Sequence, residues 1–236
     1  MTMNKSILFF AIALLLFSCE NNNSKGKEVV SKVETKKAIP EEPVLHVYNM
    51  GGAPSGIVSQ LVDRLKAIYP NTEYSGELSF VDSAYIKNDK KGDDRYWWSK
   101  LRPHMIKTTD TKRGISLVVI NAEVCNWDKK NKDSHANLGI SNLGGHVSFV
   151  SYQRLKKNRR DNVTDMLKIA VHELGHSVGG LVPNRGDDGS HCPNKHCLMV
   201  NAKNHFPYTP ITGFCESCDK VMRSKGFETT RMGFKQ

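Results

Sequence analysis

A histidine pair in the second half of the chain has the spacing of a metal site. His172 and His176 are four residues apart, and Glu173 directly follows the first of them. On a helix, residues four apart lie one turn above each other, so both imidazoles face the same side. The pattern His-Glu-x-x-His is typical of zinc peptidases, in which the glutamate is the general base. We therefore predict that His172 and His176 bind zinc and that Glu173 is catalytic.

The third zinc ligand is not obvious from this motif. A catalytic zinc usually takes three protein ligands and a water. A common extension of the motif has a glycine and then a third histidine six residues after the second one. Here Gly179 is present, but the next expected position is Val182. Only Glu216 and Glu228 follow the motif as glutamates, which disfavours a glutamate ligand from a second helix. The remaining candidates are Asp187, Asp188, His191, Cys192 and His196.

Four cysteines follow the motif in two close pairs. They are Cys192 with Cys197 and Cys215 with Cys218. Such pairs suit a closed tetrahedral zinc site. The alternative is two disulfides, which an exported protein can form. We favour zinc, because disulfides in short Cys-x-x-Cys motifs are usually redox-active rather than structural. Cys125 lies in a mostly apolar run and is predicted to be a buried thiol.

The element that positions the motif is predicted to be an amphipathic helix. Asn162 or Thr164 can cap its start, and Gly179-Gly180 can end it. Its apolar residues recur at spacings of three and four, which places them on one side. His172 and His176 lie on nearly the opposite side and are not part of this apolar stripe. The stripe consists of Val163, Met166, Leu167, Ala170, Val171, Leu174 and Val178.

The elements before the motif alternate between strands and helices. Apolar runs predict strands at residues 44–50, 77–81, 115–120, 136–142 and 145–152. Helical spacing predicts helices from Ser55 to the break at Pro70 and at residues 95–107, although the second contains Pro103. The strand at 115–120 is apolar nearly throughout and is expected at the centre of the sheet. This order indicates an α/β (α+β) fold with a twisted, mixed sheet.

The first nineteen residues resemble the signal peptide of a bacterial lipoprotein. Lys5 precedes an apolar run at residues 7–17, which is too short for a comfortable membrane span. The run ends in Leu16-Phe17-Ser18-Cys19, which is similar to a lipobox. The resemblance implies that residues 1–18 are removed and that acylated Cys19 anchors the protein to a membrane of the bacterial cell envelope. The alternatives are an ordinary secretory signal or an uncleaved anchor.

The segment after Cys19 is polar and predicts a flexible tether. Residues 20–43 contain almost no large apolar side chain and cannot form a core. We therefore expect a signal peptide at 1–18, a tether at 19–43 and one folded domain at 44–236. The formal net charge of +10 suits a surface beside anionic lipids or cell-envelope polymers. The lysines are spread along the chain, so a nucleic-acid partner is not expected.

Together, the histidines, cysteines and their spacing resemble the archaemetzincins. That family has the pattern HExxHxxGxxHC, four residues, CxM, about seventeen residues and CxxC. Two spacings differ: eleven residues separate Gly179 from His191 where the family has two, and fifteen separate Met199 from Cys215. We expect the first difference to be an inserted surface loop. The matching residues are His172, Glu173, His176, Gly179, His191, Cys192, Cys197, Met199, Cys215 and Cys218.

The resemblance implies two zinc ions per chain. His191 would complete the catalytic site, and the four cysteines would hold a structural zinc. Met199 would be the methionine that packs beneath the catalytic zinc. Asp187 and Asp188 remain the alternative third ligands. The implied fold is metzincin-like: an upper part at about 44–179, with a mixed sheet, a backing helix and an active-site helix, and a small irregular zinc-bound lower part at about 180–236.

The function implied by the resemblance is zinc-dependent hydrolysis of peptide bonds. Three neutral histidines leave the charge of zinc largely uncompensated, so its water becomes acidic and Glu173 can take the proton. A peptide or protein substrate is expected antiparallel to the edge strand at residues 136–142. We expect a monomer. The alternatives are a catalytically silent, zinc-stabilised lipoprotein that binds envelope proteins or cell-wall polymers, and an amidase that cleaves non-peptide amides.

Overall fold

The computed structural model describes residues 43–86, 94–109, 114–128, 133–159, 162–178, 189–201 and 213–232. All of them belong to the second of the chain's two units, residues 41–236. The predicted signal peptide, Cys19 and all but the last residue of the predicted tether lie outside the described residues. Within these seven stretches, no helix has both the length and the apolar character needed to cross a membrane.

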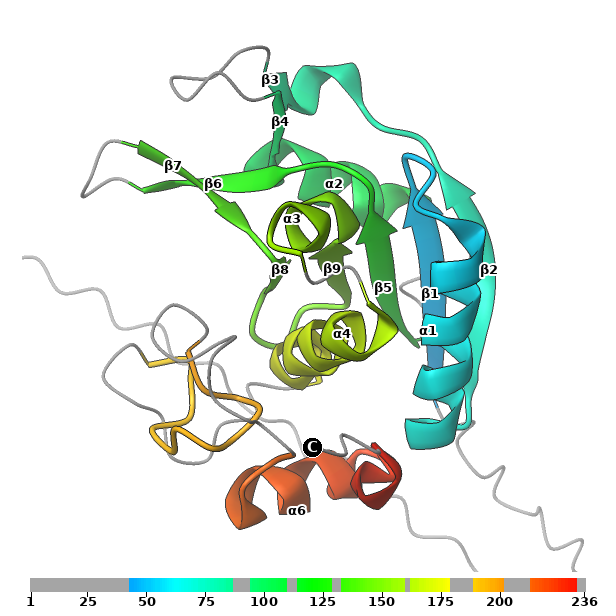
Figure 1. Cartoon of the computed structure of the whole chain (residues 1–236), viewed down its shortest axis with the longest axis vertical. Coiled ribbons are helices and arrows are strands. Elements are labelled where there is room, and N and C mark those ends of the chain that lie inside the picture. Colours follow the sequence, from blue (N-terminus) through cyan, green and yellow to red (C-terminus); the bar gives the residue numbers. More distant parts are fainter. Residues whose placement is uncertain are drawn as a thin grey trace, which may run out of the picture. The chain divides into compact units, whose positions relative to one another are not determined.

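The main sheet has five strands in the order β2-β1-β5-β9-β8 (Figure 1). They are β1 (Val44–Met50), β2 (Thr72–Leu78), β5 (Gly114–Ile120), β8 (Gly139–Ser141) and β9 (Val147–Ser151). The pairs β1–β2, β1–β5 and β5–β9 are parallel, and β8 runs antiparallel to β9. The predicted mixed sheet is therefore confirmed, and the apolar strand predicted at 115–120 is its central strand.

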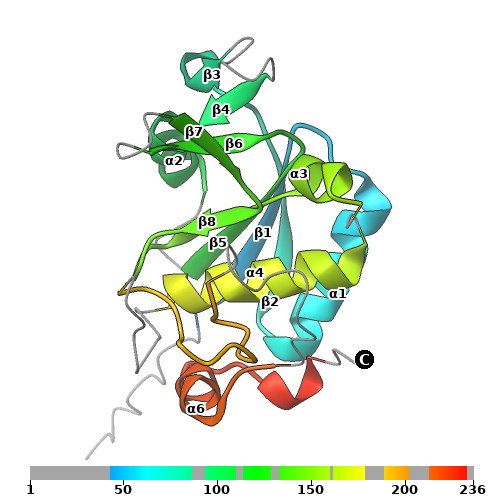
Figure 2. The same ribbon diagram turned by 60° about the vertical axis from the view of Figure 1, so that its left-hand side comes forward.

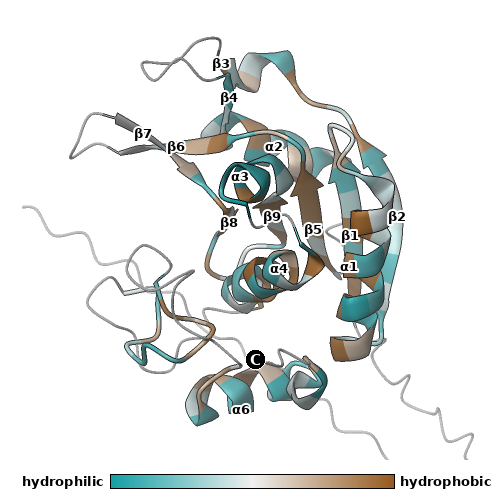
Figure 3. Cartoon of the chain, viewed as in Figure 1, coloured by the Kyte–Doolittle hydropathy of each residue, from teal (hydrophilic) through white to brown (hydrophobic). Residues whose placement is uncertain are grey.

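Helices cover both faces of this sheet. Helices α1 (Ser55–Ile68) and α4 (Val163–Ser177) share one core with Leu117 and Val119 of β5. Helix α2 (Trp98–Thr108) packs on the opposite face with Val118 and Ile120. Successive residues of β5 thus enter opposite cores, which explains why the strand is apolar on both faces (Figure 3).

A second, four-stranded sheet lies beside the first and was not predicted from the sequence. Its order is β3-β4-β6-β7, with β3 (Tyr85–Ile86), β4 (Arg95–Trp97), β6 (Val124–Asp128) and β7 (Asp133–Asn137). A short 3₁₀ turn, η1 (Asp82–Ala84), precedes β3. The predicted helix at 95–107 is therefore wrong at its start, because residues 95–97 pair as β4. Helix α2 continues through Pro103, and both Pro103 and Ser99, whose carbonyl lacks its helical N–H partner, are exposed residues.

The other strand boundaries also shift from the prediction. The strand expected at 77–81 covers Thr72–Leu78 instead, because it is a largely polar edge strand with few apolar markers. The strand expected at 136–142 is split between β7 of the second sheet and β8 of the main sheet. The strand expected at 145–152 is β9, and the short helix α3 (Tyr152–Lys157) follows it directly.

Helix α4 lies between the sheet and the C-terminal segments (Figure 2). The Asn162 side chain accepts a hydrogen bond from the Asp165 N–H at 2.8 Å, which confirms the predicted N-terminal cap. Residues 189–201 and 213–232 are mostly irregular and include α6 (Glu216–Ser224) and the 3₁₀ turn η2 (Thr229–Arg231). Isolated bridges join Cys192 to Val200 and Cys197 to Gly213. Gly179, Gly180, Val182, Asp187 and Asp188 lie outside the described residues.

Candidate metal centre

The structure brings three of the predicted ligands together. His172 and His176 come from the last turns of α4, and His191 comes from the segment 189–201. One nitrogen from each ring lies within 4.8 Å of the other two. The His191 ring stacks over that of His172 at 5.4 Å between centroids and meets that of His176 edge-on at 4.9 Å. The three imidazoles therefore converge from two segments of the chain.

One hydrogen bond fixes the orientation of the His172 ring. Its Nδ1 lies 2.7 Å from the Leu198 carbonyl oxygen, and a carbonyl can only accept, so Nδ1–H is the donor. The neutral ring then presents its Nε2 lone pair on the other side, as metal-binding histidines do. Burial lowers the pKa of His172 to about 4, despite the opposing effect of the Leu198 carbonyl. His172 is therefore a neutral imidazole near pH 7.

The separation of the imidazole nitrogens fits a tetrahedral zinc site. The Nε2 atoms of His172 and His176 are 3.1 Å apart. With zinc–nitrogen bonds of about 2.05 Å, two tetrahedral ligands are about 3.3 Å apart. A zinc ion thus fits between these rings without a large movement of either.

Glu173 lies beside the histidines and is almost fully buried, with 7% of its surface exposed. This burial raises the pKa of Glu173 to about 8. A cation held by the histidines would oppose this effect, because a nearby positive charge favours the ionised carboxylate. Strand β8 lies against the Glu173 side chain: an added Cβ at Gly139 would lie 2.7 Å from Glu173 Cγ.

Met199 packs against helix α4 at Gly175. An added Cβ at Gly175 would overlap the sulfur atom of Met199 and lie 2.9 Å from its terminal methyl carbon. Met199 itself is fully buried. The sequence prediction placed Met199 beneath the zinc, and the structure places it against the residue that directly precedes His176.

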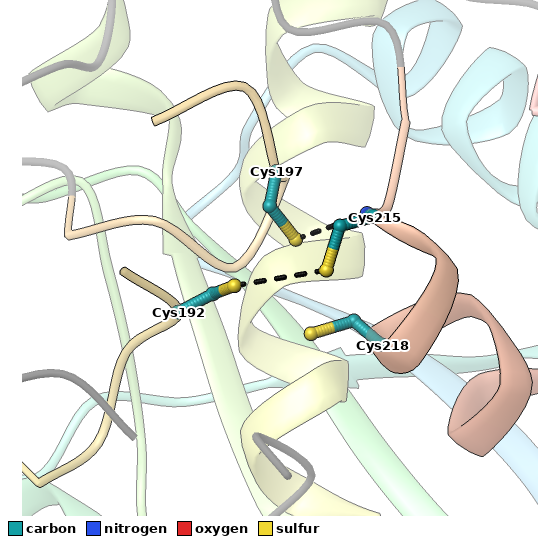
Figure 4. Close-up of side chains that lie close together, drawn as sticks. All are labelled: Cys192, Cys197, Cys215 and Cys218. Atoms are coloured by element: carbon teal, nitrogen blue, oxygen red, sulfur yellow. Dashed lines mark hydrogen bonds between the residues drawn. The ribbon is translucent and has the colours of Figure 1, made fainter. Parts of the chain in front are cut away.

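The four predicted cysteines also converge, as Figure 4 shows. Their sulfur atoms all lie within 4.8 Å of one another, and all four are free thiols. The Cys192 and Cys215 sulfurs are 3.7 Å apart. Zinc–sulfur bonds of about 2.3 Å place two tetrahedral ligands about 3.8 Å apart. The cluster therefore has the dimensions of a four-cysteine zinc site.

Backbone groups around Cys197 favour its thiolate form. Its sulfur accepts hydrogen bonds from the Met199 N–H at 3.4 Å and the Cys215 N–H at 3.3 Å. Together with the hydrogen bond from the Cys218 thiol, which is the largest cause, these lower the pKa of Cys197 to about 6. Zinc binds the thiolate rather than the thiol, so this environment suits a ligand. Cys125 lies apart from the cluster and is buried, as predicted.

Some residues that contribute to the site were not singled out by sequence reasoning. Gly139 and Gly175 permit close approach to Glu173 and Met199, and Leu198 supplies the carbonyl that orients His172. A glycine within a strand is a known sign of close approach, so Gly139 was detectable in principle. The predicted candidate His196 is exposed and is not part of the histidine group.

Comparisons with known proteins agree with this arrangement at the level of the fold. No protein-family model matches the chain, and no curated protein matches it significantly. The solved archaemetzincin of Methanopyrus kandleri is similar, with 17% identity and a TM-score of 0.58 over 80% of this chain and 98% of that chain. The archaemetzincin of Archaeoglobus fulgidus, solved with malonate, has 21% identity and a TM-score of 0.53 over 75% of this chain and 99% of that chain. The described part of the chain therefore has an archaemetzincin-like fold.

Proposed function

We propose that this protein is a zinc-dependent peptidase whose catalytic zinc is bound by His172, His176 and His191. The observation that carries the proposal is the convergence of three imidazole nitrogens within 4.8 Å, with a buried glutamate next in sequence to His172. The archaemetzincin-like fold supports the same assignment. A zinc ion bound there would polarise a substrate carbonyl and acidify water at neutral pH.

Glu173, Leu198 and His172 would each have a separate role in the reaction. Glu173 would accept the proton of the attacking water and deliver it to the leaving amine. The Leu198 carbonyl holds the His172 ring in place, and burial keeps that ring neutral. The low exposure of Glu173 and of both helical histidines limits competing bulk water around the reacting atoms.

Strand β8 is the proposed site for the peptide backbone. It is one of the two edge strands of the main sheet within the described residues, and it is the one that borders Glu173. An extended peptide can add to such an edge through backbone hydrogen bonds. Of the edge strand predicted at 136–142, only Gly139–Ser141 belongs to this sheet.

We assign a structural role to a second zinc, held by Cys192, Cys197, Cys215 and Cys218. The sulfur separation of 3.7 Å and the free thiols support this assignment. The proposed total is two zinc ions per chain. We further propose that acylated Cys19 anchors the protein in the bacterial cell envelope. Mass spectrometry of the N-terminus of the membrane-extracted protein would test this. A chain that begins at an acylated Cys19 supports the anchor, and a chain with an unmodified Cys19 contradicts it.

The test of the proposed activity is Glu173→Ala. Glu173 is not a ligand of the proposed zinc, so the variant should keep its fold and both zinc ions. Hydrolysis of a peptide library should fall by roughly a hundredfold or more, because the general base is lost. Metal analysis and circular dichroism of the same preparation provide the control. Undiminished turnover would remove Glu173 as the base, and a zinc-loaded wild-type protein that cleaves no peptide would favour the silent binding protein instead.

A further inference from the structure

The edge strand β8 is short, so its position needs support beyond the sheet. Only three residues, Gly139–Ser141, pair with β9. Edge strands have one unpaired side, and a strand of three residues has little pairing to hold it. The structure shows where the additional support comes from: the last two turns of α4, which also carry the candidate metal site.

The first attachment is a direct contact between Gly139 and Glu173. An added Cβ at Gly139 would lie 2.7 Å from Glu173 Cγ and 2.8 Å from Ile169 Cγ2. Real Cβ contacts are almost never this short. Only glycine lets β8 approach the helix this closely, and the contacting atom belongs to the proposed general base.

The second attachment is a chain of buried hydroxyl groups. Ser177, one residue after His176, lies with its Oγ 2.7 Å from Ser141 Oγ on β8 and 2.5 Å from Ser148 Oγ on β9. Ser148 Oγ also donates to the Glu173 carbonyl at 3.4 Å. A single hydroxyl at the end of the helix therefore holds both strands.

A third attachment follows directly after β8. The Gly144 N–H donates to the carbonyl oxygen of His176 at 2.9 Å. The segment from Gly139 to Gly144 thus contacts the end of α4 at three residues, Glu173, Ser177 and His176.

The spacing of these contacts explains why they fit together. Gly139 and Ser141 are two residues apart on a strand, a distance of roughly 6.5–7 Å. Glu173 and Ser177 are one turn apart on a helix, a rise of about 6 Å. The two repeats nearly match, so the pairs Gly139–Glu173 and Ser141–Ser177 can form at once. Together they set the register of the strand against the helix.

The backbone of the same residues faces the free edge. The Leu138 carbonyl accepts from the Ser151 N–H at 2.7 Å, so Leu138 directs its backbone groups toward β9. Backbone groups alternate in direction along an antiparallel strand, so those of Gly139 and Ser141 point away from β9. These are the groups that a peptide added to the edge would pair with.

We infer that Gly139, Ser141 and Ser177 are positioning residues that lock the substrate-binding edge of β8 in register with Glu173. The inference rests on the proposed peptidase function. Gly139 sets the distance between the strand and the base, and the Ser141–Ser177 hydrogen bond prevents the strand from sliding along the helix. A peptide paired to β8 would then present its scissile bond at a fixed position relative to Glu173.

The first experiment tests, without an activity assay, whether Ser177 holds β8 against α4. Hydrogen–deuterium exchange of the full-length protein should show faster exchange in the segment 139–146 for Ser177→Ala than for the wild type. Ser116→Ala is the matched control. It too removes a buried serine hydroxyl, here on β5 of the main sheet, but one without a hydrogen-bond partner among the described residues. Unchanged exchange in Ser177→Ala, or the same increase in Ser116→Ala, would contradict the proposed role of Ser177 in holding β8.

The second experiment measures its effect on catalysis. With an extended peptide, kcat/KM should fall about tenfold for Ser177→Ala and about a hundredfold for Gly139→Ala, because small misplacements are costly. With a short substrate that lacks the residues to pair with β8, Ser177→Ala should lose less than twofold. Zinc content should be unchanged in Ser177→Ala. Equal losses on both substrates, or no loss on either, would contradict the inference.

The outcomes separate this inference from the proposed function. A wild-type protein without zinc-dependent hydrolysis contradicts the peptidase proposal, whatever the variants do. An active wild type whose Ser177→Ala variant matches it in exchange and kinetics contradicts only the positioning role. Should Gly139→Ala fail to fold, Ser177→Ala still decides the question.

Discussion

At the scale of single residues, the histidine site combines a neutral imidazole, His172, with a buried acid, Glu173. Burial disfavours charge on both His172 and Glu173, which lowers the pKa of the first and raises that of the second. A neutral imidazole is the form that binds metal, so burial prepares His172 for this role. The same burial leaves Glu173 dependent on a neighbouring positive charge to remain ionised near pH 7.

The third ligand gives the sharpest test at this scale. Full-length wild-type protein should contain two zinc ions per chain, and His191→Ala should contain one, because two protein ligands rarely retain a catalytic zinc. The zinc that remains should be the one held by cysteines, and hydrolysis should be lost. Metal analysis by mass spectrometry, paired with a peptide-cleavage assay, measures both quantities.

The two loop aspartates are the controls for this prediction. Asp187→Ala and Asp188→Ala should each keep two zinc ions and near-wild-type turnover. A loss of one zinc in either variant, with His191→Ala still fully loaded, would transfer the third ligand to that aspartate.

The ligands were predictable from the sequence because metal-binding residue types recur at short spacings that metal sites use. His172 and His176 follow from the helical repeat, and the four cysteines follow from their close pairs. His191 was chosen over the aspartates only through its distance to Met199, which matches the archaemetzincin pattern. By contrast, the Leu198 carbonyl that orients His172 was not predictable, because any residue can supply a backbone carbonyl.

At the scale of elements, helix α4 is built around a close approach to Met199. An alanine at Gly175 would overlap the Met199 sulfur. In an exposed helix interior, replacing glycine by alanine stabilises by about 1 kcal/mol. We expect the opposite here: Gly175→Ala should lower the free energy of unfolding by about 1–3 kcal/mol, because overpacking a filled core is costly. Urea denaturation monitored by circular dichroism measures the change.

Gly56 provides the matched control for Gly175. It lies in the first turn of α1, and an added Cβ there meets nothing within 4 Å. Gly56→Ala should therefore cause no loss of stability. Equal or greater stability of Gly175→Ala would mean that Met199 does not pack tightly against Gly175.

The elements themselves were predictable where burial leaves a clear pattern. Strands β1, β5 and β9 and helices α1 and α4 have apolar periodicity that follows from their two-sided or one-sided burial. Strand β2 is an edge strand with polar residues on much of its surface, so its limits were misplaced. The second sheet was missed because its strands have two to five residues, too few to show a repeat.

At the scale of the whole molecule, one chain segment, residues 189–201, contributes to both candidate zinc sites. His191 is followed directly by Cys192, and Cys197 is two residues before Met199. The cysteine cluster also ties the segment 189–201 to α6, which carries Cys218. Outside these ligands, the segment 189–201 contributes Leu198 and Val200 to the main core. Zinc bound by the cysteines would therefore add a restraint on the segment that carries His191, beside the packing of Leu198 and Val200.

This coupling makes a prediction about a residue far from the catalytic centre in sequence. Cys218→Ser should release the structural zinc, because one of four thiolates is lost, and lower Tm by several degrees. Binding at the histidine site should also weaken by roughly tenfold or more, since His191 loses its anchored neighbour Cys192. A zinc titration with a competing chelator measures both affinities. Wild-type zinc affinity of the histidine site in this variant would show that α4 and Leu198 hold His191 without the cysteines. If the wild-type protein has no free thiols among the four cysteines, they form two disulfides and not a zinc site.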